Sequence, residues 1–203
     1  MKKKMTYDHI ITILVVIYLI IHLIYNILFQ SGNKLWNISL IFIAIIAMKF
    51  IFSFTFMKKS KIMYMLGLIF IVMSIYLGNV LNIYTFISQY DKILHFVSGI
   101  ILSVFGFSIY IYFEHKEQNK LNYKFAIIFT LMFSIAMAGI WEIWEFSTDQ
   151  IFGLTSQHNS LFDTMMDIIC GTIGGCLILP LVYIHIKNKK IKFLEVIIKE
   201  ITE

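Results

Sequence analysis

Arginine is absent from this chain of 203 residues, proline occurs once, and cysteine occurs twice. Charged residues make up only 14% of the sequence, whereas 59% of it is hydrophobic and the mean hydropathy is +0.82. This composition excludes a soluble globular protein and is typical of an integral membrane protein. Cys170 and Cys176 lie six residues apart in one predicted helix. They therefore form neither a disulfide with each other nor a CxxC site.

Long apolar runs define the predicted fold. A bilayer core about 30 Å thick requires roughly 20 apolar residues per helix. Runs of this kind occupy residues 9–29, 35–57, 62–80, 92–113, 125–148 and 162–186. They lack the alternation of a membrane barrel strand, and the first is too long for a secretory signal. We therefore predict an all-α, polytopic membrane helical bundle of about six transmembrane helices, forming a single integral membrane domain over residues 1–203.

Lysine alone predicts the orientation, because arginine is missing. If the N-terminus is cytoplasmic, Lys34 and Lys92 are the only lysines expected outside, as the positive-inside rule requires. The three tryptophans, Trp36, Trp141 and Trp144, then fall at the outer boundary, where indole rings prefer to lie. An even number of spans returns the C-terminus to the cytoplasm. Both termini are therefore expected inside.

The formal net charge of +5 is spread over the predicted inner loops. It is explained by orientation and by contacts with anionic membrane lipids, so no nucleic-acid partner is expected, and the sequence indicates no particular protein partner. Residues 188–203 place Ile191, Leu194, Ile198 and Ile201 at helical spacing. This segment is expected to form a cytoplasmic, interfacial amphipathic helix, or alternatively an extension of the last transmembrane helix.

Acidic residues gather at the predicted outer ends of the last three spans. There are twelve Asp and Glu residues, and six of them lie there: Asp91, Glu142, Glu145, Asp149, Asp163 and Asp167. At about 100° per residue, the three acids of the fifth span share one face, as do the two of the sixth. Asp91 shares a face of the fourth span with His95 by the same rule. If these faces converge, the acids form one site, which requires cations or shared protons.

Structural explanations exist for some of these residues. Asp91 is a candidate N-cap, and the stretch from Ser160 to Asp163 resembles a capping box, where acids are favoured by the helix dipole. His95 alternatively forms a hydrogen bond to a neighbouring helix, and His158 is expected to be solvated. Glu142 and Glu145 lie near the predicted C-terminal end of their helix, where the helix dipole is negative and disfavours acidic residues. The dipole therefore does not explain these two residues.

Small residues support convergence of the last three spans. Gly99 and Gly106 lie on the fourth span, and Gly171, Gly174 and Gly175 lie on the sixth. Glycine lets helix backbones approach closely in a membrane. Pro180 cannot donate a hydrogen bond to the carbonyl of Cys176 and is expected to kink the sixth span.

Three motifs together resemble a known group. They are YDKILHFVSG at residues 90–99, Glu142-x-x-Glu145-x-x-x-Asp149, and Asp163-x-x-x-Asp167 followed by Gly171 and Gly174. Across about residues 88–178 the chain resembles the YjdF-type bacterial membrane proteins and, more distantly, the VanZ-like family. The resemblance implies a multi-pass protein of the bacterial cytoplasmic membrane and supports the acidic site, but it implies no particular activity.

Three functions remain open for the acidic site. The first is a hydrolase or transferase acting on a lipid-linked or headgroup substrate, dependent on a divalent cation such as Mg²⁺, Mn²⁺ or Ca²⁺. Its expected metal ligands are Asp91, Glu142, Glu145, Asp163 and Asp167. Asp149 is expected either beside the ligands, in the outer shell of the metal, or at the entrance to the site, and His95 is expected to be a general base or a further ligand. The second is a cation-coupled or proton-coupled transporter. The third is a noncatalytic envelope-binding protein.

Overall fold

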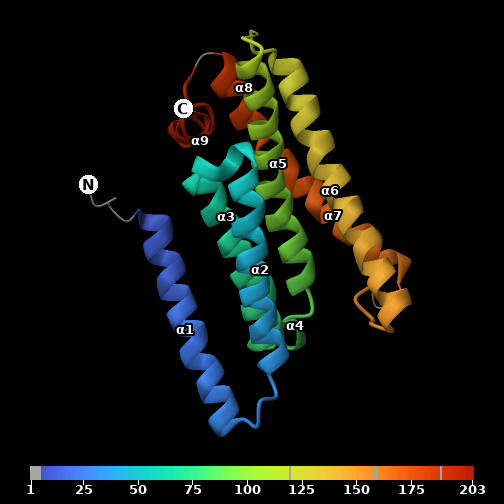
Figure 1. Cartoon of the computed structure of the whole chain (residues 1–203). Coiled ribbons are helices and arrows are strands. Elements are labelled where there is room, and N and C mark those ends of the chain that lie inside the picture. The colour runs from blue at the N-terminus through green and yellow to red at the C-terminus, as the bar shows by residue number, and fades with distance from the viewer. Residues whose placement is uncertain (1–5, 119, 158–159, 188) are drawn as a thin grey trace, which may run out of the picture. The chain divides into compact units, whose positions relative to one another are not determined.

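The computed structural model describes residues 6–118, 120–157, 160–187 and 189–203. Within these ranges every regular element is a helix (Figure 1), and six helical segments are long and apolar enough to cross a membrane. These segments are Tyr7–Phe29, Leu35–Phe54, Lys61–Val80, Tyr90–Lys116, Tyr123–Phe152 and Leu161–Lys187. The predicted all-α membrane fold with six spans is thus confirmed. The chain divides into two compact units, Met1–Ser88 and Gln89–Glu203, which are called here the N-terminal and C-terminal units.

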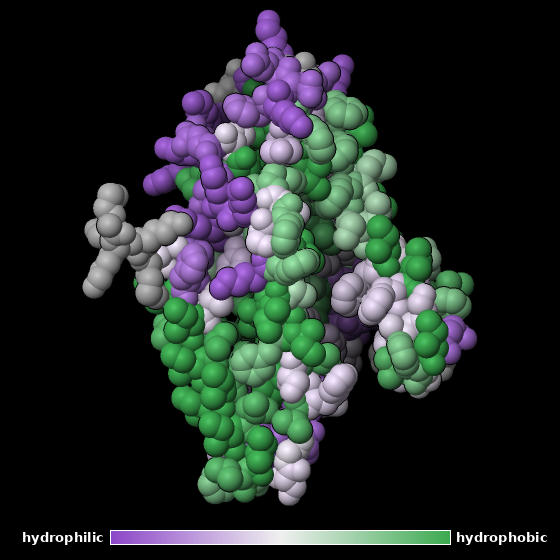
Figure 2. Space-filling model, viewed as in Figure 1, coloured by the Kyte–Doolittle hydropathy of each residue, from purple (hydrophilic) through white to green (hydrophobic). Residues whose placement is uncertain are grey.

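The N-terminal unit contains the first three spans. Its elements are α1 (Tyr7–Phe29), α2 (Leu35–Phe54), the 3-10 turn η1 (Phe56–Lys59), α3 (Lys61–Ile71), the π-helix η2 (Val72–Val80) and α4 (Ile83–Phe86). The third span is formed by α3 and η2 together, and α2 packs against both of them and against α1. Figure 2 shows an extended hydrophobic surface along α1. In the most apolar stretch of 18 residues in α1, only 17% of the residues are buried, as expected for a helix that faces lipid.

The C-terminal unit is built around one long helix. Its elements are α5 (Tyr90–Lys116), α6 (Tyr123–Phe152), α7 (Leu161–Cys176), α8 (Leu179–Lys187) and α9 (Lys192–Thr202). Helix α5 packs against α6, α7 and α9, and α6 also packs against α7. Half of the most apolar window of α5 is buried. Helix α5 is therefore the axis on which the neighbouring helices are arranged.

Glycine sets the close approach of α5 and α7. A side chain added to Gly99 would collide with the carbonyl group of Gly171, and one added to Gly174 would collide with the carbonyl oxygen of Phe96. The Ser134 hydroxyl of α6 donates a hydrogen bond to the carbonyl of Gly99 at 3.1 Å, so α6 is joined to α5 at the same crossing. The predicted role of these glycines is confirmed, and the reason is that backbone contacts backbone at this crossing.

The last span is interrupted at the predicted position. Helix α7 ends at Cys176 and α8 begins at Leu179, one residue before Pro180. The proline ring cannot donate to a carbonyl four residues earlier and clashes with it, so the α-helix stops there. After α8 the backbone leaves helical geometry over residues 189–191, so α9 is a separate helix and not an extension of the span. Its apolar face buries Leu194 and Ile197, and the helix packs against α5.

Candidate functional site

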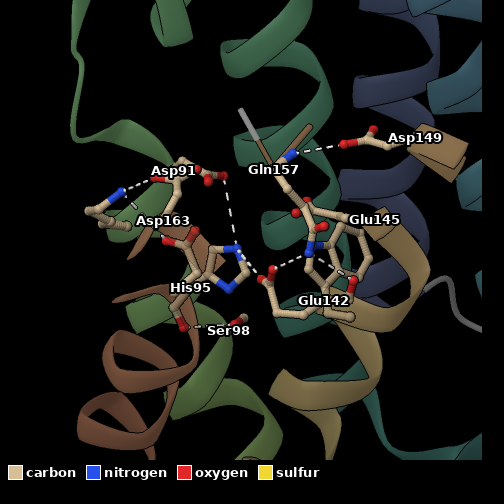
Figure 3. Close-up of polar contacts among 11 residues, drawn as sticks. Asp91, His95, Ser98, Glu142, Glu145, Asp149, Gln157 and Asp163 are labelled. Atoms are coloured by element: carbon tan, nitrogen blue, oxygen red, sulfur yellow. Dashed lines mark hydrogen bonds and ion pairs between the residues drawn. The ribbon is translucent and has the colours of Figure 1, made fainter. Parts of the chain in front are cut away.

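The predicted site residues come from three helix ends in the C-terminal unit. The first turns of α5 carry Asp91 and His95, the last turns of α6 carry three acids, and the first turns of α7 carry two. Figure 3 shows that Asp91, His95, Glu142 and Glu145 point toward one another, whereas Asp149 lies further from them. The helical phases inferred from the sequence therefore bring α5 and α6 side chains to a common centre.

His95 lies at that centre. Its Nε2 atom is 3.6 Å from Oε1 of Glu142 and 4.0 Å from Oδ1 of Asp91. Both separations exceed the length of a normal N–H···O hydrogen bond, although the imidazole is only 6% exposed. The ring therefore faces two carboxylates at distances that leave room for a bridging atom.

Two carboxylate oxygens in this centre have no hydrogen-bond partner among the described residues. They are Oε1 of Glu142 and Oδ1 of Asp167, and their residues are 4% and 1% exposed. A buried polar atom without a partner destabilises a protein by about 1–3 kcal/mol, and more when it is charged. Such oxygens are expected where a ligand completes the site, which makes these two atoms the strongest structural indication of a function.

The described residues contain two groups with the spacing of metal ligands. They are Asp91, His95 and Asp167, and His95, Glu142 and Glu145, with the ligand atoms of each group all within 4.8 Å of one another. Oxygen ligands bind Ca²⁺ at about 2.3–2.6 Å and Mg²⁺ at about 2.0–2.1 Å, so two ligands of one ion lie up to about 4–5 Å apart. The oxygen-rich set with a single imidazole fits hard divalent cations. His95 belongs to both groups.

Asp163 has a different environment. Its Oδ1 atom accepts a hydrogen bond from Nζ of Lys92 at 2.7 Å, and the same ammonium group is 3.8 Å from Oδ1 of Asp167. The backbone N–H of Asp163 donates to the Ser160 hydroxyl at 3.2 Å, so the predicted cap at the start of α7 is confirmed. Asp163 was expected as a metal ligand. Its carboxylate is instead paired with Lys92, and it belongs to neither of the two groups with metal-ligand spacing.

Asp149 supports the chain that follows α6. Its two carboxylate oxygens accept the backbone N–H groups of Ser156 and Gln157 at 2.9 and 3.0 Å. The amide of Gln157 in turn donates to Oε2 of Glu142 at 3.2 Å. Asp149 thus positions a residue that touches the cluster, and it lies outside both ligand groups.

Glu145 and Asp91 complete the placement of the predicted residues. Oε1 of Glu145 accepts a hydrogen bond from the indole Nε1 of Trp141 at 2.9 Å, which orients the carboxylate on α6. The N-cap explanation for Asp91 is wrong, because α5 begins at Tyr90 and Gln89 occupies the cap position. This difference of two residues places the Asp91 side chain in the first turn, facing His95. His158 lies outside the described residues.

Two functional side chains were not identified from the sequence. Lys92 neutralises part of the cluster, and Gln157 holds Glu142 in place. A signal for Lys92 existed, because it is one of only two lysines expected on the outer side. Gln157 follows α6 in a polar segment, and nothing in the sequence pattern connects it with Glu142.

A cleft of about 530 Å³ opens beside the cluster, between α6 and α7. Its polar lining includes Glu142, Asp149, Gln157 and Thr164, and its apolar lining includes Ile143, Phe146 and Ile168. Glu142 therefore belongs both to the acidic centre and to this cleft. A molecule with a polar head and an apolar tail fits a cavity lined in this way.

Comparison with known proteins identifies relatives but no activity. The model of a family described as "Predicted membrane protein (DUF2238)" matches residues 9–188. An uncharacterised protein of Thermotoga maritima is 30% identical over 107 residues, which is 53% of this chain. The chain covers about half of that relative, 54% of its length. No solved structure matches the chain.

Proposed function

Since this chain belongs to that family of predicted membrane proteins, as the YjdF-type resemblance indicated, we propose that its acidic centre binds a divalent cation. The protein is a multi-pass protein of the bacterial cytoplasmic membrane. In our proposal it acts as a metal-dependent hydrolase or transferase on a lipid-linked or headgroup substrate. The proposed ligands are Asp91, Glu142, Glu145 and Asp167, with His95 as a ligand or general base. The more distant VanZ-like resemblance stays a prediction.

The observation that carries this proposal is the pair of buried carboxylate oxygens that accept no hydrogen bond from the described residues. Oε1 of Glu142 and Oδ1 of Asp167 come from different helices, and their residues belong to two ligand groups that share His95. Five carboxylates lie in this region, Asp91, Glu142, Glu145, Asp163 and Asp167, and Lys92 forms ion pairs with two of them, Asp163 and Asp167. Two carboxylates 5 Å apart repel each other by roughly 3 kcal/mol at an effective dielectric constant of 20. A bound divalent cation relieves this repulsion and supplies the missing partners.

The chemistry follows from the ligand set and the cleft. When bound, a divalent cation activates water for hydrolysis and polarises a phosphoryl oxygen. His95 would accept a proton at Nε2, the atom that faces the carboxylates of Asp91 and Glu142. The cleft next to Glu142 offers an apolar wall for the tail of a lipid-linked substrate. This arrangement favours hydrolysis by water over a mechanism with a protein nucleophile.

The test measures metal directly. Detergent-purified protein is dialysed against Mn²⁺, and bound metal is quantified by mass spectrometry and by electron paramagnetic resonance. We expect stoichiometric Mn²⁺ in the natural protein. Glu142→Gln and Asp167→Asn should each weaken binding at least about tenfold, because loss of even a supporting residue in a metal site has an effect of this size.

Glu117→Gln is the control. It also removes one negative charge, but Glu117 follows the last turn of α5, at the opposite end of that helix from Asp91, so Mn²⁺ binding should be retained. Equal loss in all three variants would mean that the metal responds only to net charge and would refute a built site. Absence of bound metal together with cation-driven uptake into vesicles would assign the acids to transport.

A further inference from the structure

A second cavity lies entirely within the N-terminal unit and is lined by basic residues. It has a volume of about 440 Å³, and four lysines line it: Lys49, Lys58, Lys59 and Lys61. His9 and Asp8 are the other ionisable side chains in its wall, apart from the phenol of Tyr64. Four lysines against one aspartate give an excess of at least three positive charges. None of the acidic-centre residues belongs to this unit, so the cavity is independent of the proposed metal site.

The cavity forms where three helices end on the same side of the unit. Helix α1 begins there, α2 ends there, and α3 begins there (Figure 1). The short turn η1 carries Lys58 and Lys59 between α2 and α3. The N-terminal ends of α1 and α3 add partial positive charge from their backbone N–H groups. The C-terminal end of α2 adds a partial negative charge, but the two N-terminal ends and the four lysines outweigh it and favour an anionic ligand.

The position of Lys49 within a transmembrane helix distinguishes this cavity from an ordinary basic loop. It is the only charged residue in α2 and lies five residues before the end of that helix, about 7.5 Å along the axis. A lysine within a transmembrane segment is unfavourable unless it reaches water or an anion. In the described part of the chain, neither Lys49 nor Lys58 forms an ion pair with a carboxylate. The positive-inside rule explains loop lysines, but it does not explain a lysine aimed into a cavity from within the span.

The floor of the cavity is polar and held in place. The Thr12 hydroxyl donates to the carbonyl of Asp8 at 2.7 Å and lies 3.2 Å from the Tyr64 hydroxyl. Thr12 and Tyr64 are each only 7% exposed. Phe52 and Ile13 line the cavity on the apolar side. The cavity thus combines fixed hydroxyl groups, flexible cations and an apolar edge.

We infer that this cavity, called here the lysine cavity, binds a phosphate group with net negative charge. Ammonium groups and hydroxyls are the usual partners of phosphate oxygens. The place of the cavity at the ends of three spans, together with its apolar edge, favours the phosphate of an anionic phospholipid headgroup. A free phosphate ester offers the same chemistry from solution, and the experiment separates the two sources.

The test compares phosphate ligands on the whole, detergent-purified chain. Short-chain phosphatidylglycerol, phosphatidylcholine and sodium phosphate are titrated, and the dissociation constant is measured from intrinsic fluorescence and from the shift in thermal midpoint. Lys49→Gln with Lys58→Gln is the test variant, and Lys116→Gln with Lys120→Gln is the control with the same loss of charge outside the cavity. Lys49→Arg with Lys58→Arg preserves the charge and checks that the fold tolerates substitution.

We expect phosphatidylglycerol to bind more tightly than phosphatidylcholine. The test variant should lose affinity for it by at least about tenfold, since each lost hydrogen bond to a charged group has an effect of about that size, while the control and the arginine variant retain it. If sodium phosphate binds as tightly as phosphatidylglycerol, with the same dependence on the two lysines, the site is a phosphate site served from solution. Equal binding of the two lipids, or equal loss in test and control variants, would overturn the inference.

Discussion

Lys92 balances the acidic cluster from within. Its ammonium group is 2.7 Å from Asp163 and 3.8 Å from Asp167, and the lysine side chain is 18% exposed. Removing one partner of a largely buried ion pair leaves the other charge uncompensated, which destabilises a protein by about 3–5 kcal/mol when burial is complete. A single lysine therefore allows α5 and α7 to pack before any cation is bound.

Lys92→Gln is predicted to have two opposite effects. The metal-free protein should lose about 2–3 kcal/mol of stability, because partial exposure reduces the full effect of a buried pair. Mn²⁺ should bind at least about tenfold more tightly, since a competing positive charge next to Asp167 is gone. Thermal midpoints with and without Mn²⁺ measure both effects.

Lys34→Gln is the control for this change, because Lys34 is the other lysine expected on the outer side and lies in the N-terminal unit. Its Mn²⁺ affinity should equal that of the natural protein. Weaker Mn²⁺ binding in Lys92→Gln than in Lys34→Gln would contradict a competing role for Lys92.

The sequence pattern predicted which faces of the helices carry the acidic residues, but it did not predict which side chains those acids contact. Helical phase alone placed Glu142 and Glu145 on one face, and the structure directs both toward His95. The pairing of Lys92 with Asp163 joins positions 71 residues apart, so no local pattern encodes it. The assignments to Asp149 and Asp163 followed from their charge, whereas their observed partners follow from where the loop and α7 come to lie.

At the level of elements, the crossing of α5 and α7 controls the site. Gly99 lies four residues after His95 and Gly171 four residues after Asp167, so the backbone contact between them sits one turn from the cluster. Any outward movement of α7 separates Asp167 from His95. The helix-helix distance thus sets the spacing of the proposed ligands.

Gly99→Ala is predicted to destabilise the protein by about 1–3 kcal/mol and to weaken Mn²⁺ binding. The added methyl group meets the carbonyl group of Gly171, and backbone cannot move aside as a flexible side chain can. The measurements are the thermal midpoint in detergent and bound Mn²⁺.

Gly139→Ala is the matched control on α6. A side chain there meets nothing within 4 Å, so alanine should leave the midpoint unchanged or raise it slightly through its better helix propensity. If both alanine variants behave alike, close packing at Gly99 does not control the site.

The sequence predicted the elements well where one residue type acts locally. Pro180 breaks the last span as expected, and Ser160 caps α7. The two-residue error at the start of α5 changed Asp91 from a cap to a side chain in the first turn. Helix ends are decided by the balance of several weak hydrogen bonds, so they are less predictable than the apolar runs.

At the level of the whole molecule, the distribution of lysine predicts the membrane orientation. Both termini are expected in the cytoplasm, with the acidic centre toward the outside. On this predicted orientation the start of α1, where the lysine cavity lies, is expected at the cytoplasmic side, and the start of α5, where the acidic centre lies, is expected outside. Orientation therefore decides which compartment supplies each ligand.

Cysteine labelling tests this orientation. Cys170 and Cys176 are replaced by alanine, and single cysteines are introduced as Gln118→Cys, expected inside, and Asn33→Cys, expected outside. A membrane-impermeant maleimide applied to intact cells should label only the second. Labelling of Gln118→Cys from outside, with Asn33→Cys protected, would reverse the orientation and overturn the assignment of the acidic centre to the outer side.

The sequence by itself determined the membrane class, the six spans and the helix faces that carry the acids, because these depend on hydropathy and on the helical repeat alone. Only the tertiary structure decided that Glu142 and Asp167 each bury an oxygen that accepts no hydrogen bond from the described residues, that Lys92 is paired with Asp163, and that four lysines line one cavity. These features depend on how closely helices cross, which is set by contacts between residues far apart in the chain.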